Sequence, residues 1–181
     1  QALLPASERV SQRLEAFEVI WEPKDVVGGD LYWVSQETSQ HLDIVVFDCT
    51  GHGVPGAMMT MLVGPALERL HADAASLSPG SILSELDGAV RAMLNQGDWS
   101  EGGANDGFDA ALARIDEQRK LISFAAAHMS LIKLQADGTC TRVAGERKPL
   151  GYPAAQARMP LEENVIPYEK GDRFILYSDG V

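Results

Sequence analysis

The order of hydrophobic and polar residues divides the first half of the chain into strands followed by helices. Apolar residues that alternate with polar ones predict a strand over residues 17–21, and an aromatic, β-branched run predicts another over 31–34. The almost continuous apolar run within 41–48 is typical of a strand that is covered on both faces. Two stretches with apolar residues about every 3.6 positions, 53–70 and 78–94, predict consecutive helices.

Short strands dominate the second half, after a polar, glycine-rich segment without periodicity. Their predicted ranges are 108–115, 121–126, 129–134, 139–143 and 173–178. The first four are expected to form an antiparallel meander because short turns separate them, whereas a long proline-containing connection over 145–167 leads to the last. Strands, then two helices, then strands indicate an α+β layered sandwich rather than alternating β-α-β units.

Length and charge narrow the possible functions. A chain of 181 residues fits one domain, and 26 acidic against 15 basic residues give a net charge of −11, which repels a phosphate backbone and argues against nucleic acid as a partner. No continuous apolar run of about 18 residues and no basic-then-apolar leader is present, so we expect a soluble domain. Cys49 and Cys140 lack metal-type spacing, which favours a reducing cytoplasm over a disulfide framework or zinc site.

Three aspartates lie next to predicted strands. Asp30 follows Gly28 and Gly29, Asp48 ends the long apolar strand, and Asp179 ends the last strand. Aspartate beside glycine is also common in turns, so each one alone has an ordinary structural explanation. Gathered in one partly buried cleft, the three carboxylates would repel one another and take up protons unless a cation compensated them. The pattern therefore predicts a site for a hard divalent ion, Mg²⁺ or Mn²⁺, with water filling most coordination positions.

Residues Gly51–Gly56 also match the G-x-G-x-x-G pattern of dinucleotide-binding proteins. Two features argue against that function. The segment 71–80, which should become a second strand with a terminal acid, is polar and leads into a helix, and Asp48 would place negative charge near a bound pyrophosphate. A receiver domain with Asp48 as phosphoacceptor would need a five-fold strand–helix repeat that the pattern lacks.

Four separated motifs resemble those of one known family in order and spacing. They are Val27–Tyr32, Phe47–Ala57, Pro149–Gly151 and Leu176–Val181. This set resembles the metal-dependent protein phosphatases of the 2C type (PPM), in the bacterial SpoIIE branch. The resemblance implies a four-layer α-β-β-α sandwich of two antiparallel sheets flanked by helices. It also implies that residues 1–15 end an N-terminal linker helix and that 16–181 form a phosphatase domain lacking its C-terminal part.

The same resemblance implies a site with two Mg²⁺ or Mn²⁺ ions. Asp48 would bridge the ions and the backbone carbonyl of Cys49 would be a ligand, while Asp30 and Asp179 would complete the shell directly or through water. Water between two cations loses a proton readily and attacks phosphorus in line, so Asp30, Asp48 and Asp179 are the implied catalytic residues. The implied activity is hydrolysis of phosphoserine and phosphothreonine in a protein.

The resemblance also implies partners. The substrate would be a phosphorylated partner-switching protein of the STAS, anti-sigma-antagonist type. An upstream sensor in the same parent chain is implied as well, and this sensor is a candidate membrane anchor. The phosphatase domain itself is expected in the cytoplasm. A homodimer is one possible oligomeric state. The alternative is a catalytically inactive domain of this fold that serves as a binding module in bacterial signalling.

Several polar residues near these motifs have two readings. His52 is a candidate proton donor, but three residues separate it from Asp48 and a structural role is favoured. His128 is predicted to be a turn or packing residue. Asp106 and Asp109 are predicted to serve as turn residues, with support of an additional ion as the alternative.

Overall fold

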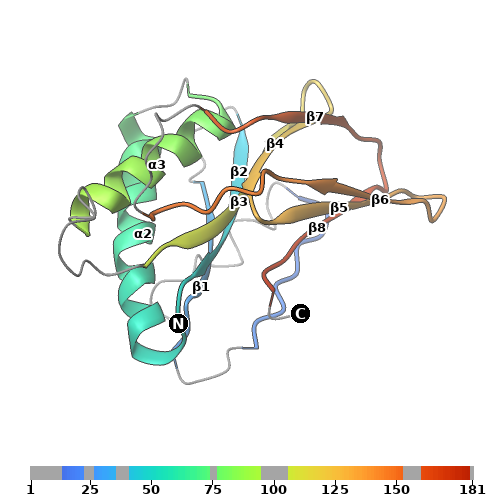
Figure 1. The fold of residues 1–181 in the computed structure, drawn as a ribbon. Helices are drawn as coiled ribbons and strands as arrows, with labels where there is room; N and C mark the ends of the chain where they lie inside the picture. The colour runs from blue at the N-terminus through green and yellow to red at the C-terminus, as the bar shows by residue number, and fades with distance from the viewer. Residues whose placement is uncertain are drawn as a thin grey trace.

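Two antiparallel sheets packed face to face form the protein, and two helices cover the larger sheet (Figure 1). The computed structural model describes residues 14–22, 27–35, 41–73, 77–94, 106–152 and 160–179. Its elements are β1 (Asp30–Val34), β2 (Leu42–Cys49), α2 (Gly53–Asp73), α3 (Pro79–Met93), β3 (Phe108–Asp116), β4 (Leu121–Ala127), β5 (Ser130–Leu134), β6 (Cys140–Ala144), β7 (Asn164–Pro167) and β8 (Arg173–Leu176). The five-stranded sheet has the order β1-β2-β3-β4-β7 and the three-stranded sheet the order β6-β5-β8.

Strand β2 contributes to a hydrophobic core on each of its faces. Val45 and Phe47, both fully buried, belong to the core beneath α2 and α3. Leu42 belongs to a second core, which it shares with Leu131 of the three-stranded sheet. The prediction of a strand covered on both faces is confirmed, because β2 lies between the helical layer and the second sheet.

The helices follow the predicted periodicity. The helix α3 begins after the N-cap Ser78, whose side chain accepts a hydrogen bond from the backbone N–H of Ser81, and Pro79 occupies the first turn. The buried face of α3 carries Ile82, Leu86 and other apolar residues at the expected spacing. Of the helices in the described ranges, none is long and apolar enough to cross a lipid bilayer.

The predicted two-sheet sandwich is confirmed, with three corrections of detail. The meander is wrong as one unit, because the chain leaves the first sheet after β4 and enters the second at β5, turning at His128. The predicted connection over 145–167 contains β7, which pairs with β4. Residues 17–21 form no strand, and Phe17 and Trp21 instead lie against Tyr32 with ring centroids 6.5 and 6.3 Å away.

Other expectations concern parts of the chain that are only partly described. The linker helix predicted over 1–15 lies outside the described residues except at positions 14 and 15, which are not helical. On the outer face of the three-stranded sheet, no helix occurs within the described ranges. The helical layer over the five-stranded sheet and the two sheets themselves are therefore the layers that the structure describes.

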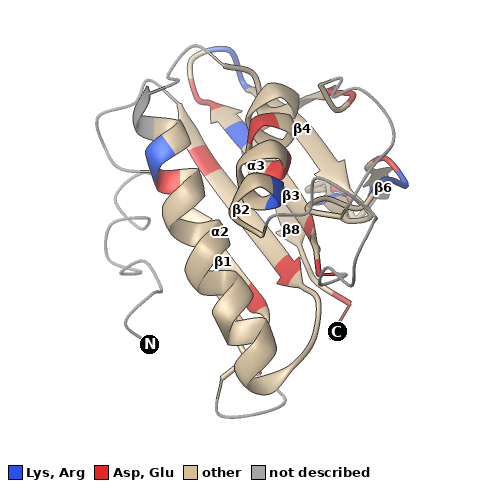
Figure 2. Ribbon diagram, turned by 60° about the vertical axis from the view of Figure 1, so that its left-hand side comes forward, with Lys and Arg blue, Asp and Glu red and all other residues tan. Residues whose placement is uncertain are grey.

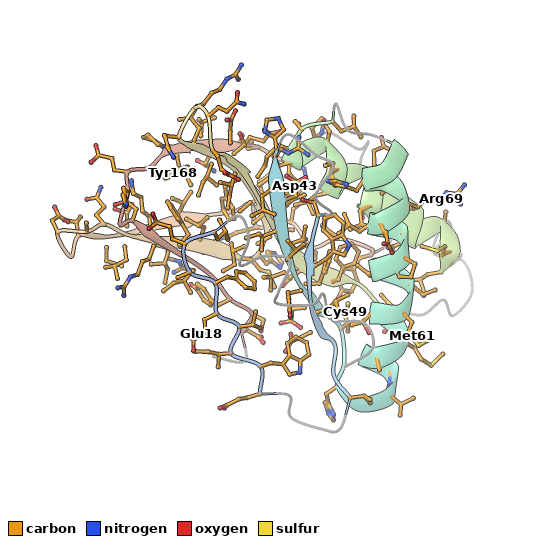
Figure 3. The ribbon with its side chains drawn as sticks, turned by 180° about the vertical axis from the view of Figure 1, so that it is seen from behind. Glu18, Asp43, Cys49, Met61, Arg69 and Tyr168 are labelled. Carbon is orange, nitrogen blue, oxygen red and sulfur yellow. The ribbon has the colours of Figure 1, made fainter. Side chains whose placement is uncertain are left out.

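A buried ion-pair network secures the end of β2 that lies away from Cys49 (Figure 3). Asp43 is fully buried and accepts hydrogen bonds from Arg114 Nε and Nη2 at 2.8 and 2.7 Å. His71 Nε2 lies 3.1 Å from the same carboxylate, and Arg114 Nη1 donates to the carbonyl of Leu77 at 2.6 Å. The network thus joins β2, β3, the end of α2 and the segment before α3. Within it, the charges of Asp43 and Arg114 compensate each other.

Asp43→Asn is expected to lower the free energy of unfolding by about 3–5 kcal/mol, because the buried Arg114 charge loses its counter-ion. Burial raises the pKa of Asp43, but hydrogen bonds from Arg114 and His71 outweigh it and hold that pKa below the usual 3.8. A carboxyl with a lowered pKa stabilises the fold above pH 3.8, and this stabilisation is lost as pH falls through the folded value. The destabilisation by Asp43→Asn should therefore be full at pH 7 and shrink below pH 4 in urea titrations.

The matched control is Glu85→Gln on the exposed face of α3. It removes one carboxylate charge with an expected change within about 0.5 kcal/mol. Equal stability of the two variants at pH 7 would show that the network contributes nothing.

Candidate active site

The strand register places three aspartates side by side at one end of the five-stranded sheet. Asp30 of β1 lies opposite Asp48 of β2, and Asp48 lies opposite Asp109 of β3. Directly opposed residues in an antiparallel pair have Cβ atoms about 4.5–5.5 Å apart and point to the same face. That face is the one toward the second sheet, because Tyr32 and Val46, two positions along β1 and β2, pack against the core between the sheets.

The second sheet adds a fourth carboxylate. Beyond the end of β8, Ser178 forms a side-chain hydrogen bond with Asp30, and the carboxyl of Asp179 forms one with Asp48. The acidic ends of β1 and β2 and the C-terminal end of the chain accordingly lie at the same end of the molecule (Figure 2). Of the predicted residues, Asp30, Asp48 and Asp179 are thus brought together from two sheets.

The carboxylates raise one another's affinity for protons. Burial, followed by the charges of Asp30 and Asp179, raises the pKa of Asp48 to about 7. Burial is also the main reason that the pKa values of Asp30 and Asp109 are raised, with Asp179 adding to both and His128 opposing the effect at Asp109. A proton bound at Asp48 would partly relieve the repulsion that a cation would otherwise neutralise.

The donor set fits a hard divalent ion. Aspartate oxygens and a backbone carbonyl are the ligands that Mg²⁺ uses, and Mg²⁺ binds through one or two carboxylates while it keeps several waters. In the part of the chain that the structure describes, no three His, Cys, Asp or Glu side chains surround one point closely enough to hold an ion by themselves. An ion held by Asp30, Asp48 and Asp179 would therefore need a carbonyl and water to fill its remaining positions.

Close backbone packing surrounds the carbonyl of Cys49. The backbone N–H of Cys49 donates to the carbonyl of Gly29 at 3.1 Å, and a Cβ on Gly29 would lie 2.5 Å from the carbonyl oxygen of Cys49. A Cβ on Gly56 would collide with the carbonyl of Gly51 and lie 2.9 Å from Gly29 Cα. The glycines of the G-x-G-x-x-G pattern thus bring the first turn of α2 against the β1 and β2 ends. The strands around this turn are antiparallel, so the parallel β-α-β unit of a dinucleotide site is absent from the described ranges.

The thiol of Cys49 is directed away from this chemistry. Its side chain is 2% exposed and belongs to the core beneath the helices. Burial, with the charges of Asp48 and Asp30, raises the pKa of Cys49 to about 12. The thiol therefore stays protonated near neutral pH and is unsuited to act as a nucleophile.

The turn after Cys49 is held by a second set of hydrogen bonds. Thr50 N donates to the carbonyl of Gly107 at 2.9 Å, and Gly107 N donates to Thr50 Oγ1 at 3.1 Å. The hydroxyl of Tyr152 lies 2.5 Å from Thr50 Oγ1, and Gly151 N donates to Asp87 Oδ1 of α3 at 2.7 Å. The segment that contains the predicted Pro149–Gly151 motif thus braces the turn that follows the aspartate of β2.

Two further residues lie at the site. Asp109, predicted to be a turn residue with support of an additional ion as the alternative, lies within β3. His128 lies in the turn between β4 and β5, as predicted, and places Nδ1 3.1 Å from Asp109 Oδ1. His52 is exposed in the bend between β2 and α2. No local motif marks Asp109 or His128, because only the strand register reveals that Asp109 faces Asp48.

Asp48→Asn is expected to stabilise the metal-free protein at pH 8, by on the order of 1 kcal/mol after solvent screening, or about 2–4 °C in Tm. A carboxyl with a raised pKa binds its proton more tightly in the folded state, so stability falls as pH rises from about 4 to about 7. The gain should be smaller at pH 5, where the folded protein already holds that proton. Thermal unfolding in the presence of a chelator measures both values, and a lower Tm for Asp48→Asn at pH 8 would contradict the repulsion.

Comparisons with known proteins agree with the fold and with the motifs. The family model described as Stage II sporulation protein E (SpoIIE) matches residues 38–181. The phosphoserine phosphatase RsbP of Bacillus subtilis is 26% identical over 156 residues, which are 86% of this chain and 36% of RsbP. The chain thus spans about a third of the length of that curated relative.

Solved structures share the architecture. The SiaA-PP2C domain of Pseudomonas aeruginosa has a TM-score of 0.82 and 33% sequence identity, over 99% of this chain and 67% of that one. A structure of RsbX in complex with magnesium has a TM-score of 0.62 at 19% identity, over 87% of this chain and 69% of that one, and shows a shared fold. Because the SpoIIE match covers well over half of its residues, the chain belongs to the SpoIIE family of PP2C-like bacterial phosphatases.

Proposed function

We propose that this domain is a metal-dependent protein phosphatase that hydrolyses phosphoserine and phosphothreonine in a regulatory protein. The observation that carries the proposal is the convergence of Asp30, Asp48 and Asp179 from two different sheets. Membership of the SpoIIE family and the likeness to RsbP, a phosphoserine phosphatase, support the reaction class.

Each residue has a proposed task at two Mg²⁺ or Mn²⁺ ions. Asp48 would bridge the ions, the carbonyl of Cys49 would be a ligand, and Asp30 and Asp179 would complete the shell directly or through water. When bound, such ions supply an activated water and neutralise charge on the phosphoryl group. The protonated Cys49 thiol makes a covalent cysteinyl intermediate unsuitable, so direct attack by water fits the site best.

The substrate and setting belong to the same proposal. A phosphorylated partner-switching protein of the STAS type is the proposed substrate, as the resemblance to the SpoIIE branch implies. An upstream sensor in the parent chain, a cytoplasmic location and a homodimer complete the proposed setting. The net charge of −11 supports a protein substrate rather than nucleic acid.

Phosphate release from a phosphoserine peptide and from p-nitrophenyl phosphate, with and without Mn²⁺, tests the function. We expect release that requires Mn²⁺. Asp48→Asn and Asp179→Asn should each reduce it by more than the roughly 10–100-fold that loss of an outer-shell partner costs. Glu85→Gln, which changes an exposed carboxylate on α3, serves as the matched control.

Two results would contradict the proposal. Metal-dependent phosphate release that survives both aspartate substitutions would show that Asp48 and Asp179 are not the metal ligands. Tight binding of a phosphorylated STAS protein without any turnover in Mn²⁺ would indicate the alternative, an inactive binding module of this fold.

Tyr152→Phe tests the brace behind the site. The substitution removes the hydroxyl that lies 2.5 Å from Thr50 Oγ1 and keeps the ring. Loss of one neutral hydrogen bond, about 1 kcal/mol, should weaken Mn²⁺ activation roughly 5-fold because the turn after Cys49 becomes less fixed. An unchanged Mn²⁺ concentration at half-maximal activity would show that the brace does not position the metal-binding turn.

A further inference from the structure

His128 is a histidine next to the carboxylate cluster for which the proposed metal centre has no use. It lies between β4 and β5, where the chain passes from one sheet to the other, and its ring Nδ1 is 3.1 Å from Asp109 Oδ1. Asp109 in turn lies opposite Asp48 in the ladder. The ring thus stands beside the proposed site, with a side chain that is 38% exposed.

The backbone at His128 has the left-handed conformation that glycine adopts most easily. His128 has φ of 58°, in the left-handed region where a residue with a Cβ costs roughly 1–2 kcal/mol relative to glycine. Its N–H donates to the carbonyl of Glu146 at 2.7 Å, which holds the turn in place. Glycine would adopt this turn without that cost, so the turn alone does not explain why the residue carries an imidazole.

We propose that His128, oriented by Asp109, is the proton donor to the serine or threonine oxygen that leaves phosphorus. The proposal rests on the proposed phosphatase function and adds a catalytic residue to it. Because Nδ1 contacts Asp109, Nε2 is the ring nitrogen assigned to the proton transfer, in the arrangement by which a carboxylate orients a catalytic imidazole. An alkoxide is a poor leaving group, so a positioned acid is most useful for phosphoserine and phosphothreonine.

One P–O bond forms and one P–O bond breaks in the proposed step. The attacking water forms the new P–O bond and releases one proton to solvent. The P–Oγ bond breaks, its electron pair stays on the serine Oγ, and the proton on Nε2 of His128 moves to that oxygen. The imidazole then takes a proton from solvent, so that one water is consumed and free serine and inorganic phosphate are formed.

Acidic residues of several elements lie in the chain segments around His128, and one of them contacts its ring. Asp109 of β3 contacts the ring, and Asp179, beyond β8, acts on Asp109 through its charge. Glu146, whose carbonyl accepts the His128 N–H, has its carboxylate 3.6 Å from Lys148 Nζ and 2.6 Å from the backbone N–H of Glu162. Asp109 is therefore the carboxylate that orients the ring.

The experiment compares three phosphate esters in Mn²⁺: p-nitrophenyl phosphate, phenyl phosphate and a phosphoserine peptide. Their leaving groups are increasingly basic and thus increasingly dependent on protonation. His128→Gly and His128→Asn both suit the left-handed backbone and remove the imidazole. We expect kcat/KM to fall by about 10²-fold or more for the phosphoserine peptide and only a few-fold for p-nitrophenyl phosphate, with phenyl phosphate between them.

Two additional measurements separate proton donation from a structural role. Free imidazole should restore activity of His128→Gly toward the phosphoserine peptide, and it should have little effect with p-nitrophenyl phosphate. Asp109→Asn should keep the ring but misorient it, and so lower activity toward the peptide more than toward p-nitrophenyl phosphate. Thermal unfolding confirms that each variant is folded.

Each other outcome overturns the proposal in a recognisable way. An equal loss on all three esters without imidazole rescue would make His128 a structural residue. A loss that depends on the leaving group in His52→Gln, but not in the His128 variants, would assign the proton to His52. Wild-type protein without Mn²⁺-dependent release from any ester would refute the phosphatase function itself, and the role of His128 with it.

Discussion

Antiparallel hydrogen bonding holds Asp30, Asp48 and Asp109 side by side on three strands, and their backbone positions cannot separate without breaking the ladder. The repulsion among the three carboxylates must therefore be compensated at these positions, by protons or by cations. Burial and the charges of Asp30 and Asp179 raise the pKa of Asp48 to about 7, and a proton bound there relieves part of the repulsion in the protein alone. Divalent ions would neutralise it more completely, because each brings two positive charges to the carboxylates.

The two ends of β2 show two opposite treatments of a buried aspartate. Asp43 is fully buried, yet the Arg114 guanidinium and His71 keep its pKa low. The negative charge at this end of β2 is therefore compensated within the fold. Asp48, five residues away on the same strand, has carboxylates as its charged neighbours and a pKa raised to about 7. One end of the strand thus stabilises the fold, while the other keeps unneutralised charge available for a ligand.

The sequence predicted elements well where burial alone decides them. The run within β2 and the spacing within α3 sufficed, whereas residues 17–21 alternate correctly but lack a partner strand, which no local pattern reveals. Strand β7 was missed because only Ile166 of its four residues is buried. The turn at His128 was predicted, but its place beside Asp109 was not. That place depends on the pairing of Asp48 with Asp109, which lie about 60 residues apart in the chain, and no local pattern reveals such a pairing.

Contributions from both sheets make the site depend on how the sheets pack. Asp30 and Asp48 come from the larger sheet, Asp179 follows β8 of the smaller one, and His128 stands at the crossing between them. The core between the sheets is therefore the part that fixes the distances among these groups. Close-packed interiors transmit small shifts, and a displacement of about 1 Å at a reacting centre can cost about 10²-fold in rate.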